Sequence, residues 1–155
     1  MEKQQMAIDR LQSYLKEAQS HVERLNNVLE RLRPLYPLNI EKFSNLTSSQ
    51  KDILDALAFR FSKLQDLLGS RIFREFLNHT GYITEGKTFL ELLREIEKEG
   101  IIDIDTWSQF RKIRNLLAHD YPDEILEKIE AINFLIENAP TLIKVVKKIE
   151  SKAYR

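Results

Sequence analysis

The sequence predicts an all-α protein, an up-and-down antiparallel bundle of four to five helices that forms a single domain over residues 1–155. Three observations support this fold class. The chain holds only 4 glycines and 4 prolines among 155 residues, and it is dominated by leucine, isoleucine, glutamate and lysine, a composition that favours helices. Apolar residues recur every three or four positions in successive segments. Short connections separate these segments, as in antiparallel bundles.

The composition excludes several classes of protein. With zero cysteines, the chain has no disulfide framework, thiolate metal site or cysteine nucleophile, which fits a cytoplasmic protein. We find no apolar run long enough to span a bilayer and no signal peptide at the polar start. Because the formal net charge is +0, any nucleic acid would have to bind a local basic patch.

The first expected helix has an apolar seam at alternating spacings of four and three. Pro34 and Pro37 end it, and the apolar connector at 34–40 should lie across the bundle. His21 lies beside the seam, one turn after Glu17, and we interpret it as a partly exposed helix histidine rather than half of a metal site. The seam consists of Leu11, Leu15, Ala18, Val22, Leu25, Leu29 and Leu32.

The second segment begins at Thr47, where Thr47-Ser48-Ser49-Gln50 has the form of a capping box. Its apolar period continues past Gly69-Ser70 and ends at Gly81, which indicates either one long helix kinked at Gly69 or two helices in line. Arg60, Lys63 and Asp66 lie beside the apolar seam, on a face that we interpret as solvated.

Residues 81–88 match the pattern G-x-x-x-x-G-K-[ST] letter for letter. A P-loop, however, needs a buried strand before its glycine-rich turn. Helical residues precede Gly81, and Glu85 would place an anion beside the phosphates. We therefore interpret this segment as a turn between helices. The helix that follows it is expected to bury Phe89, Leu92, Leu93 and Ile96 and to end at Gly100.

The remaining segments predict two or three further helices. Residues 101–105 alternate like a short strand but lack a partner strand. Asp105 or Thr106 should cap the helix from Trp107 to Ala118. A later helix should bury Ile125, Ile129, Ile132 and Ile136. Ala139-Pro140 should break it, with Pro140 opening a last short helix whose solvated basic side holds Lys144, Lys147, Lys148 and Lys152.

The candidate site lies at residues 114–122, where Arg114 falls at the edge of an apolar helix face. A cation there needs a partner or a cleft. At about 100° per residue, His119 points roughly 140° away from Arg114, whereas Tyr121 points in nearly the same direction. Pro122 should end the helix near His119. Arg114 and His119 can meet either through that helix end or by combining two chains across a symmetric interface.

The segment Arg114-Asn115-Leu116-Leu117-Ala118-His119-Asp120-Tyr121 resembles the R-x4-H-x-Y signature of the HEPN superfamily, specifically its HepT-like toxin branch. The stretch at 60–69 also resembles a helix common in HepT-like proteins. The resemblance implies a homodimer in which the two motifs line one cleft, and a metal-independent ribonuclease that cleaves tRNA or mRNA without a cofactor.

The resemblance also implies a role for each motif residue. Arg114 and His119 would be catalytic, and Asn115 and Asp120 would support them. Tyr121 would be the residue to which a partner, an MntA-like nucleotidyltransferase antitoxin, attaches AMP.

The chemistry of the two residues suits ribonucleolysis. Histidine, with an unperturbed pKa of about 6.5, can transfer protons near neutrality, and the planar guanidinium can pair with two phosphate oxygens. Two other interpretations remain open. The domain could be a non-catalytic binding partner of a nucleotidyltransferase. It could also be purely structural, with Arg114 paired to an acid such as Asp103 or Asp120 while His119 caps a helix.

Overall fold

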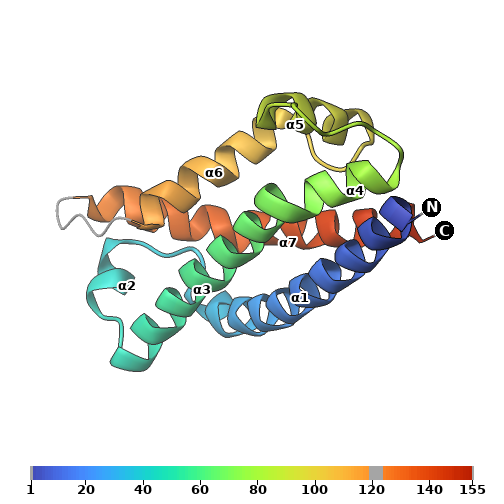
Figure 1. Cartoon of the computed structure of the whole chain (residues 1–155). Helices are drawn as coiled ribbons and strands as arrows, with labels where there is room; N and C mark the ends of the chain where they lie inside the picture. Colours follow the sequence, from blue (N-terminus) through green and yellow to red (C-terminus); the bar gives the residue numbers. More distant parts are fainter. Residues whose placement is uncertain (1, 119–123, 155) are drawn as a thin grey trace.

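Four long helical stretches run alternately up and down in the computed structural model (Figure 1). The structure describes residues 2–118 and 124–154, with the backbone alone for residues 3–9. The stretches are α1 (Glu2–Leu32), α3 (Ser48–Leu67) continued by η2 (Leu68–Ile72) and α4 (Phe73–His79), α6 (Ile104–Ala118), and α7 (Ile125–Ala153). No strand occurs in the described ranges. The predicted all-α bundle is therefore confirmed.

The four stretches enclose one apolar core. Helix α1 packs against α3, α4 and α7, and α6 packs against α3 and α7. All seven residues of the predicted α1 seam are buried, and each fully buried leucine stabilises the fold by about 1.5–3 kcal/mol. Among the described helices, none has the length and apolar character needed to cross a membrane.

The connector after α1 crosses the end of the bundle, as predicted, and includes η1 (Arg33–Leu35) and α2 (Ile40–Ser44). Leu38 is buried there. The amide side chain of Asn133 on α7 accepts from the Leu38 N–H and donates to the Leu38 carbonyl, both at 2.8 Å. The Tyr36 hydroxyl donates to the Glu137 carboxylate. The connector is therefore fixed to α7 by polar contacts as well as by burial.

The capping box at Thr47 is confirmed, because the Thr47 hydroxyl accepts from the Gln50 N–H and the Gln50 side chain accepts from the Thr47 N–H, at 3.1 and 2.9 Å. From Ser48 the chain stays helical to His79. At Gly69-Ser70, where we expected either a kinked helix or two helices in line, a π-turn, η2, joins α3 and α4 into one helical path. Single π-turns within α-helices are rare and occur often at functional sites.

Residues 81–88 form a turn between α4 and α5 (Phe89–Lys98), as predicted. Thr84 is buried, its hydroxyl donates to Asn78 Oδ1 at 2.6 Å, and its carbonyl accepts from Arg74 at 3.1 Å. Thr88 caps α5 by accepting from the Glu91 N–H. Arg74 and Asn78 on α4 thus hold a helix connection in the place where a P-loop would hold phosphate.

The start of α6 differs from the prediction. The helix begins at Ile104, and Asp103 caps it by accepting from the N–H and the hydroxyl of Thr106 at 3.0 and 2.7 Å. Asp105 and Thr106 are therefore not the caps. The bond from the Thr106 hydroxyl lowers the pKa of Asp103. Ile101 and Ile102, which looked like part of a strand, bury their side chains in the turn before α6.

The predicted break at Ala139-Pro140 is wrong, because α7 is continuous from Ile125 to Ala153 with Pro140 inside it. A proline inside a helix costs about 3 kcal/mol. Five side chains beyond it are buried, each stabilising by about 1.5–3 kcal/mol, and together they outweigh that cost: Leu142, Ile143, Val145, Val146 and Ile149. Ile125, predicted to be buried, is 44% exposed at the first turn of α7.

Candidate functional site

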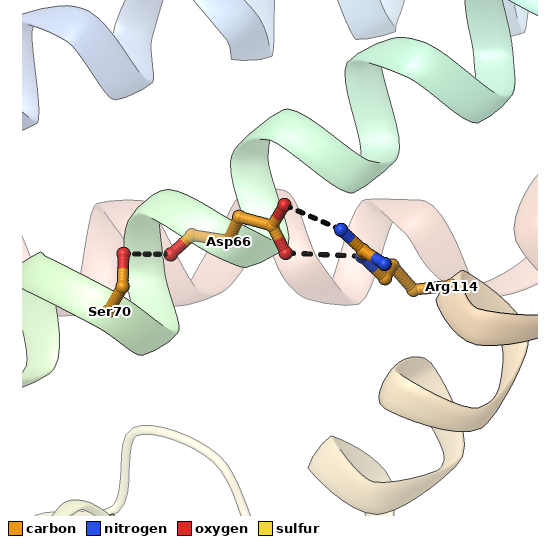
Figure 2. A network of polar contacts seen from close by, with 3 residues as sticks. All are labelled: Asp66, Ser70 and Arg114. Atoms are coloured by element: carbon orange, nitrogen blue, oxygen red, sulfur yellow. Dashed lines mark hydrogen bonds and ion pairs between the residues drawn. The ribbon is translucent and has the colours of Figure 1, made fainter. Parts of the chain in front are cut away.

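Arg114 on α6 forms a two-pronged ion pair with Asp66 on α3 (Figure 2). Its Nε donates to Asp66 Oδ1 at 3.2 Å and its Nη2 donates to Oδ2 at 3.0 Å. The expectation that Arg114 needs a partner is confirmed. Among the described residues the partner is Asp66 and not Asp103, which caps α6. Asp120, the other acid considered from the sequence, lies outside the described residues.

The pair engages only part of the guanidinium. Arginine carries five N–H donors, and Asp66 engages one on Nε and one on Nη2. No described residue accepts from Nη1. The Arg114 side chain is 34% exposed and that of Asp66 is 51% exposed. Asp66 can therefore fix the orientation of the guanidinium while its remaining donors face a ligand.

A groove of about 550 Å³ lies beside this ion pair, between α3, η2 and α6. Its volume falls in the range of small-molecule sites. It is lined by Gln65, Asp66, Gly69, Ser70, Phe89, Trp107, Arg111, Arg114 and Asn115. Two cations, two amides and two aromatic rings therefore face one space.

Close packing of Gly69 against Trp107 shapes the floor of this groove. A Cβ at position 69 would lie 2.9 Å from Trp107 Cζ2, a distance that real side chains do not adopt. The Trp107 ring is 4% exposed and packs against Phe73 and Phe89, with centroids 4.9 and 6.3 Å away. The absence of a side chain at Gly69 thus lets η2 and α6 approach one another.

The sequence-predicted site residues are only partly described. Helix α6 places Asn115, which is exposed, directly after Arg114, and both line the groove. The helix continues through Ala118, and its expected end near His119 falls outside the described residues. His119, Asp120, Tyr121 and Pro122 lie outside the described residues. The structure therefore places Arg114 with Asn115 and adds Gln65, Asp66 and Arg111, which the sequence did not single out as site residues.

A second, basic groove of about 470 Å³ lies between α1 and α3 and includes Arg24, Arg31 and Arg60. Arg60 Nη1 lies 3.4 Å from His21 Nδ1, and burial, followed by the charge of Arg60, lowers the pKa of His21. On the same helix, Phe59 is 50% exposed, and Lys63 Nζ lies 5.5 Å from its ring centroid. Cations are thus concentrated locally in a chain without net charge.

Within the described ranges, no cluster of three or more His, Cys, Asp or Glu residues is placed to hold a metal ion. Comparison of the chain with protein-family models, with curated proteins and with solved structures gives no match.

Proposed function

We propose that this protein is a metal-independent RNA endonuclease of the HEPN type, the toxin of a HepT-like toxin-antitoxin pair, in which Arg114 and His119 act at a homodimer cleft in the cytoplasm. One observation carries the proposal. Asp66 holds Arg114 in a fixed orientation at the edge of a groove, five residues before His119 and near the end of α6. This is the geometry expected of a cation that binds a phosphate rather than one that fills the core.

The chemistry needs two kinds of group. A ribose 2′-hydroxyl attacks the adjacent phosphodiester, and the bond to the 5′-oxygen of the next nucleotide breaks. The products are a 2′,3′-cyclic phosphate and a free 5′-hydroxyl. In this scheme His119 transfers a proton, as an imidazole can near neutrality. The donors of Arg114 that Asp66 does not engage stabilise the negative charge that develops on the phosphate.

The local distribution of charge supports an RNA substrate. Phosphate contacts supply most of the affinity for a nucleic acid, and the α1–α3 groove offers Arg24, Arg31 and Arg60. The half-exposed Phe59 beside it gives a base an aromatic surface on which to stack. RNA can therefore bind locally although the net charge is +0.

The test is an RNA cleavage assay in EDTA. We expect wild-type protein to cleave tRNA or mRNA and to leave 2′,3′-cyclic phosphate ends. His119→Ala and Arg114→Ala should each reduce the rate by at least about 100-fold, the effect typical of a lost proton-transfer group or charge-stabilising donor. The measurement is the initial rate of cleavage on a denaturing gel.

Arg94→Ala is the matched control, because Arg94 is exposed on α5 and does not line the groove. It should cleave like the wild type. Equal cleavage by wild type, Arg114→Ala and His119→Ala would reject the proposal, since a contaminating nuclease would explain that result.

A second candidate is a non-catalytic partner of a nucleotidyltransferase, favoured by the neutral net charge. In both cases we propose that an MntA-like enzyme transfers AMP from ATP to Tyr121 and releases pyrophosphate. Asn115 and Asp120, inside the motif, support Arg114 and His119 in the first candidate. Mass measurement of the wild type and of Tyr121→Phe checks the transfer of AMP. Binding of the partner without any RNA cleavage would select the second candidate.

A further inference from the structure

Gln65 on α3 is a buried glutamine whose side-chain oxygen is unpaired among the described residues. It is 3% exposed, and its Oε1 has no hydrogen-bond partner among the described residues. Two other described side chains have one unpaired buried atom, but Glu75 binds Arg10 and His79 binds the Ala153 carbonyl through their other atoms. The Gln65 amide forms no hydrogen bond with any described residue. An unpaired buried polar group destabilises a fold by about 1–3 kcal/mol.

This amide lines the groove beside Arg114. The adjacent π-turn, with Gly69 and Ser70 on the same wall, makes the groove an irregular site rather than ordinary helix packing. A ligand that offers a donor and an acceptor to the amide, after a small rotation of the side chain, would satisfy a group that no described residue pairs.

The other lining residues indicate which ligand fits. Phe89, which is half-buried, and Trp107, which is buried, both line the groove, so the groove has an aromatic wall suited to a flat ring. Arg111 is exposed at the rim, one helical turn before Arg114, and no described residue forms an ion pair with it. A flat ring with donors and acceptors along its edge, joined to an anion, is the chemistry of a nucleotide.

We propose that the groove is a nucleotide-binding subsite, in which the Gln65 amide binds the edge of a base and Arg111 binds its phosphate. Glutamine side chains recognise base edges in this way in nucleic-acid complexes. The inference rests on the proposed function, since it names the unit of RNA that would lie beside the phosphate held by Arg114.

Trp107 is the single tryptophan of the chain and lines the groove, so its fluorescence reports directly on occupancy. The full chain is titrated with each of the four ribonucleoside monophosphates and with short 2′-O-methyl oligonucleotides, which cannot be cleaved because the attacking hydroxyl is blocked. We expect quenching that saturates. Tighter binding of an oligonucleotide assigns the subsite to RNA, and binding of monophosphates alone assigns it to a free nucleotide; both support the proposal.

Gln65→Met replaces the amide with an unbranched apolar side chain of similar length. It should weaken nucleotide binding at least tenfold, while the urea midpoint does not fall, because an unpaired buried amide is removed. A merely structural glutamine would change the midpoint and leave binding intact. Gln109→Leu, at an exposed position of α6 outside the groove, is the matched control and should bind like the wild type.

Arg111→Ala keeps the test decisive if Gln65→Met unfolds, since Arg111 is exposed. It should weaken binding of a nucleoside monophosphate and leave binding of the uncharged nucleoside unchanged. No quenching of the wild type by any nucleotide, or equal affinity in wild type and Gln65→Met, overturns the inference. If nucleotide binding depends on Gln65 but no RNA is cleaved, the proposed function is wrong and this inference stands. If RNA is cleaved and Gln65→Met does not weaken nucleotide binding, this inference is wrong and the proposed function stands.

Discussion

The effect of Asp66 on the proposed reaction can be measured separately from its effect on the stability of the fold. Its ion pair with Arg114 is largely exposed, with the two side chains 51% and 34% accessible. Exposed pairs contribute about 0–1 kcal/mol to folding. What the pair does provide is orientation, because two parallel N–H···O bonds fix the plane of the guanidinium. Loss of Asp66 should therefore affect the proposed reaction more than the fold.

Asp66→Asn keeps the shape of the side chain and removes its charge. We expect RNA cleavage to fall about tenfold or more, because a misplaced catalytic group loses much of its effect, while the free energy of unfolding changes by less than about 1 kcal/mol. Cleavage rates and urea denaturation give the two quantities. Asp55→Asn, exposed on the same helix, should change neither. Unchanged cleavage by Asp66→Asn would show that the pair does not orient a catalytic arginine.

The sequence predicted that Arg114 needs a partner but not which one. The need for a partner follows from the local sequence, because the helical period places a cation at the edge of an apolar face. The identity of the partner depends on how α3 and α6 pack, since Asp66 precedes Arg114 by 48 positions. The unpaired state of Gln65 was equally hidden, because a polar residue beside an apolar seam is ordinarily exposed. Catalysis by Arg114 and His119 stays a prediction.

Among the elements, the π-turn η2 is indicated in the sequence by the spacing of apolar residues. Leu64, Leu68, Ile72 and Phe76 are all 0% exposed and are spaced four residues apart. In an ideal α-helix, three consecutive spacings of four would drift by about 120° around the axis. The π-turn at Leu68–Ile72 takes up this drift and keeps all four side chains in the core. The sequence predicted either a kink or two helices in line at Gly69. To predict the π-turn, one would have had to notice that these four apolar residues are spaced by four.

Gly69→Ala tests how closely η2 and α6 pack. Alanine is favoured over glycine in a helix by about 0.8–1 kcal/mol, but its Cβ would lie 2.9 Å from the buried Trp107 ring. Overpacking of this kind costs about 1–3 kcal/mol, so we expect a net loss of about 1 kcal/mol in the free energy of unfolding and a changed tryptophan emission spectrum. Urea denaturation followed by fluorescence measures both.

Ser70→Ala is the matched control for this change, because Ser70 is exposed in the same π-turn. It should leave the emission spectrum of Trp107 unchanged. A Gly69→Ala variant that is more stable than the wild type, with an unaltered spectrum, would mean that the helices can separate at this point without cost.

For the molecule as a whole, the predicted bundle was correct because apolar periodicity and short connections determine it. The ends of individual helices were predicted less well. Pro140 is a strong local signal for a helix end, yet burial on both sides of it keeps α7 continuous. The cap of α6 moved to Asp103 because its carboxylate reaches both donors of Thr106. Local signals thus failed where a competing contact was stronger.

The proposed homodimer gives a direct test of how Arg114 and His119 meet. Helix α6 is regular through Ala118 and Asp66 holds Arg114 against α3, so we expect the His119 that works with a given Arg114 to come from the second chain. When the inactive Arg114→Ala and His119→Ala variants are mixed and allowed to exchange, half of the dimers are mixed and each contains one intact site. Activity should then recover to about one quarter of the wild-type value.

Light scattering checks first that the protein is a dimer and that the variants exchange. Each variant alone, carried through the same exchange, should remain inactive. Mixed dimers without activity would instead place Arg114 and His119 of one chain in the same site.

The π-turn has a consequence for how this chain could change by insertion and deletion. A single π-turn is equivalent to one residue added to a regular α-helix. Removing Ser70 would leave Leu64, Leu68, Ile72 and Phe76 at spacings of four, three and four, which is the ordinary helical repeat. The core can therefore accept that deletion, whereas the groove would lose part of its wall. The extra residue therefore helps to form the groove wall, whereas the packing of the core does not require it.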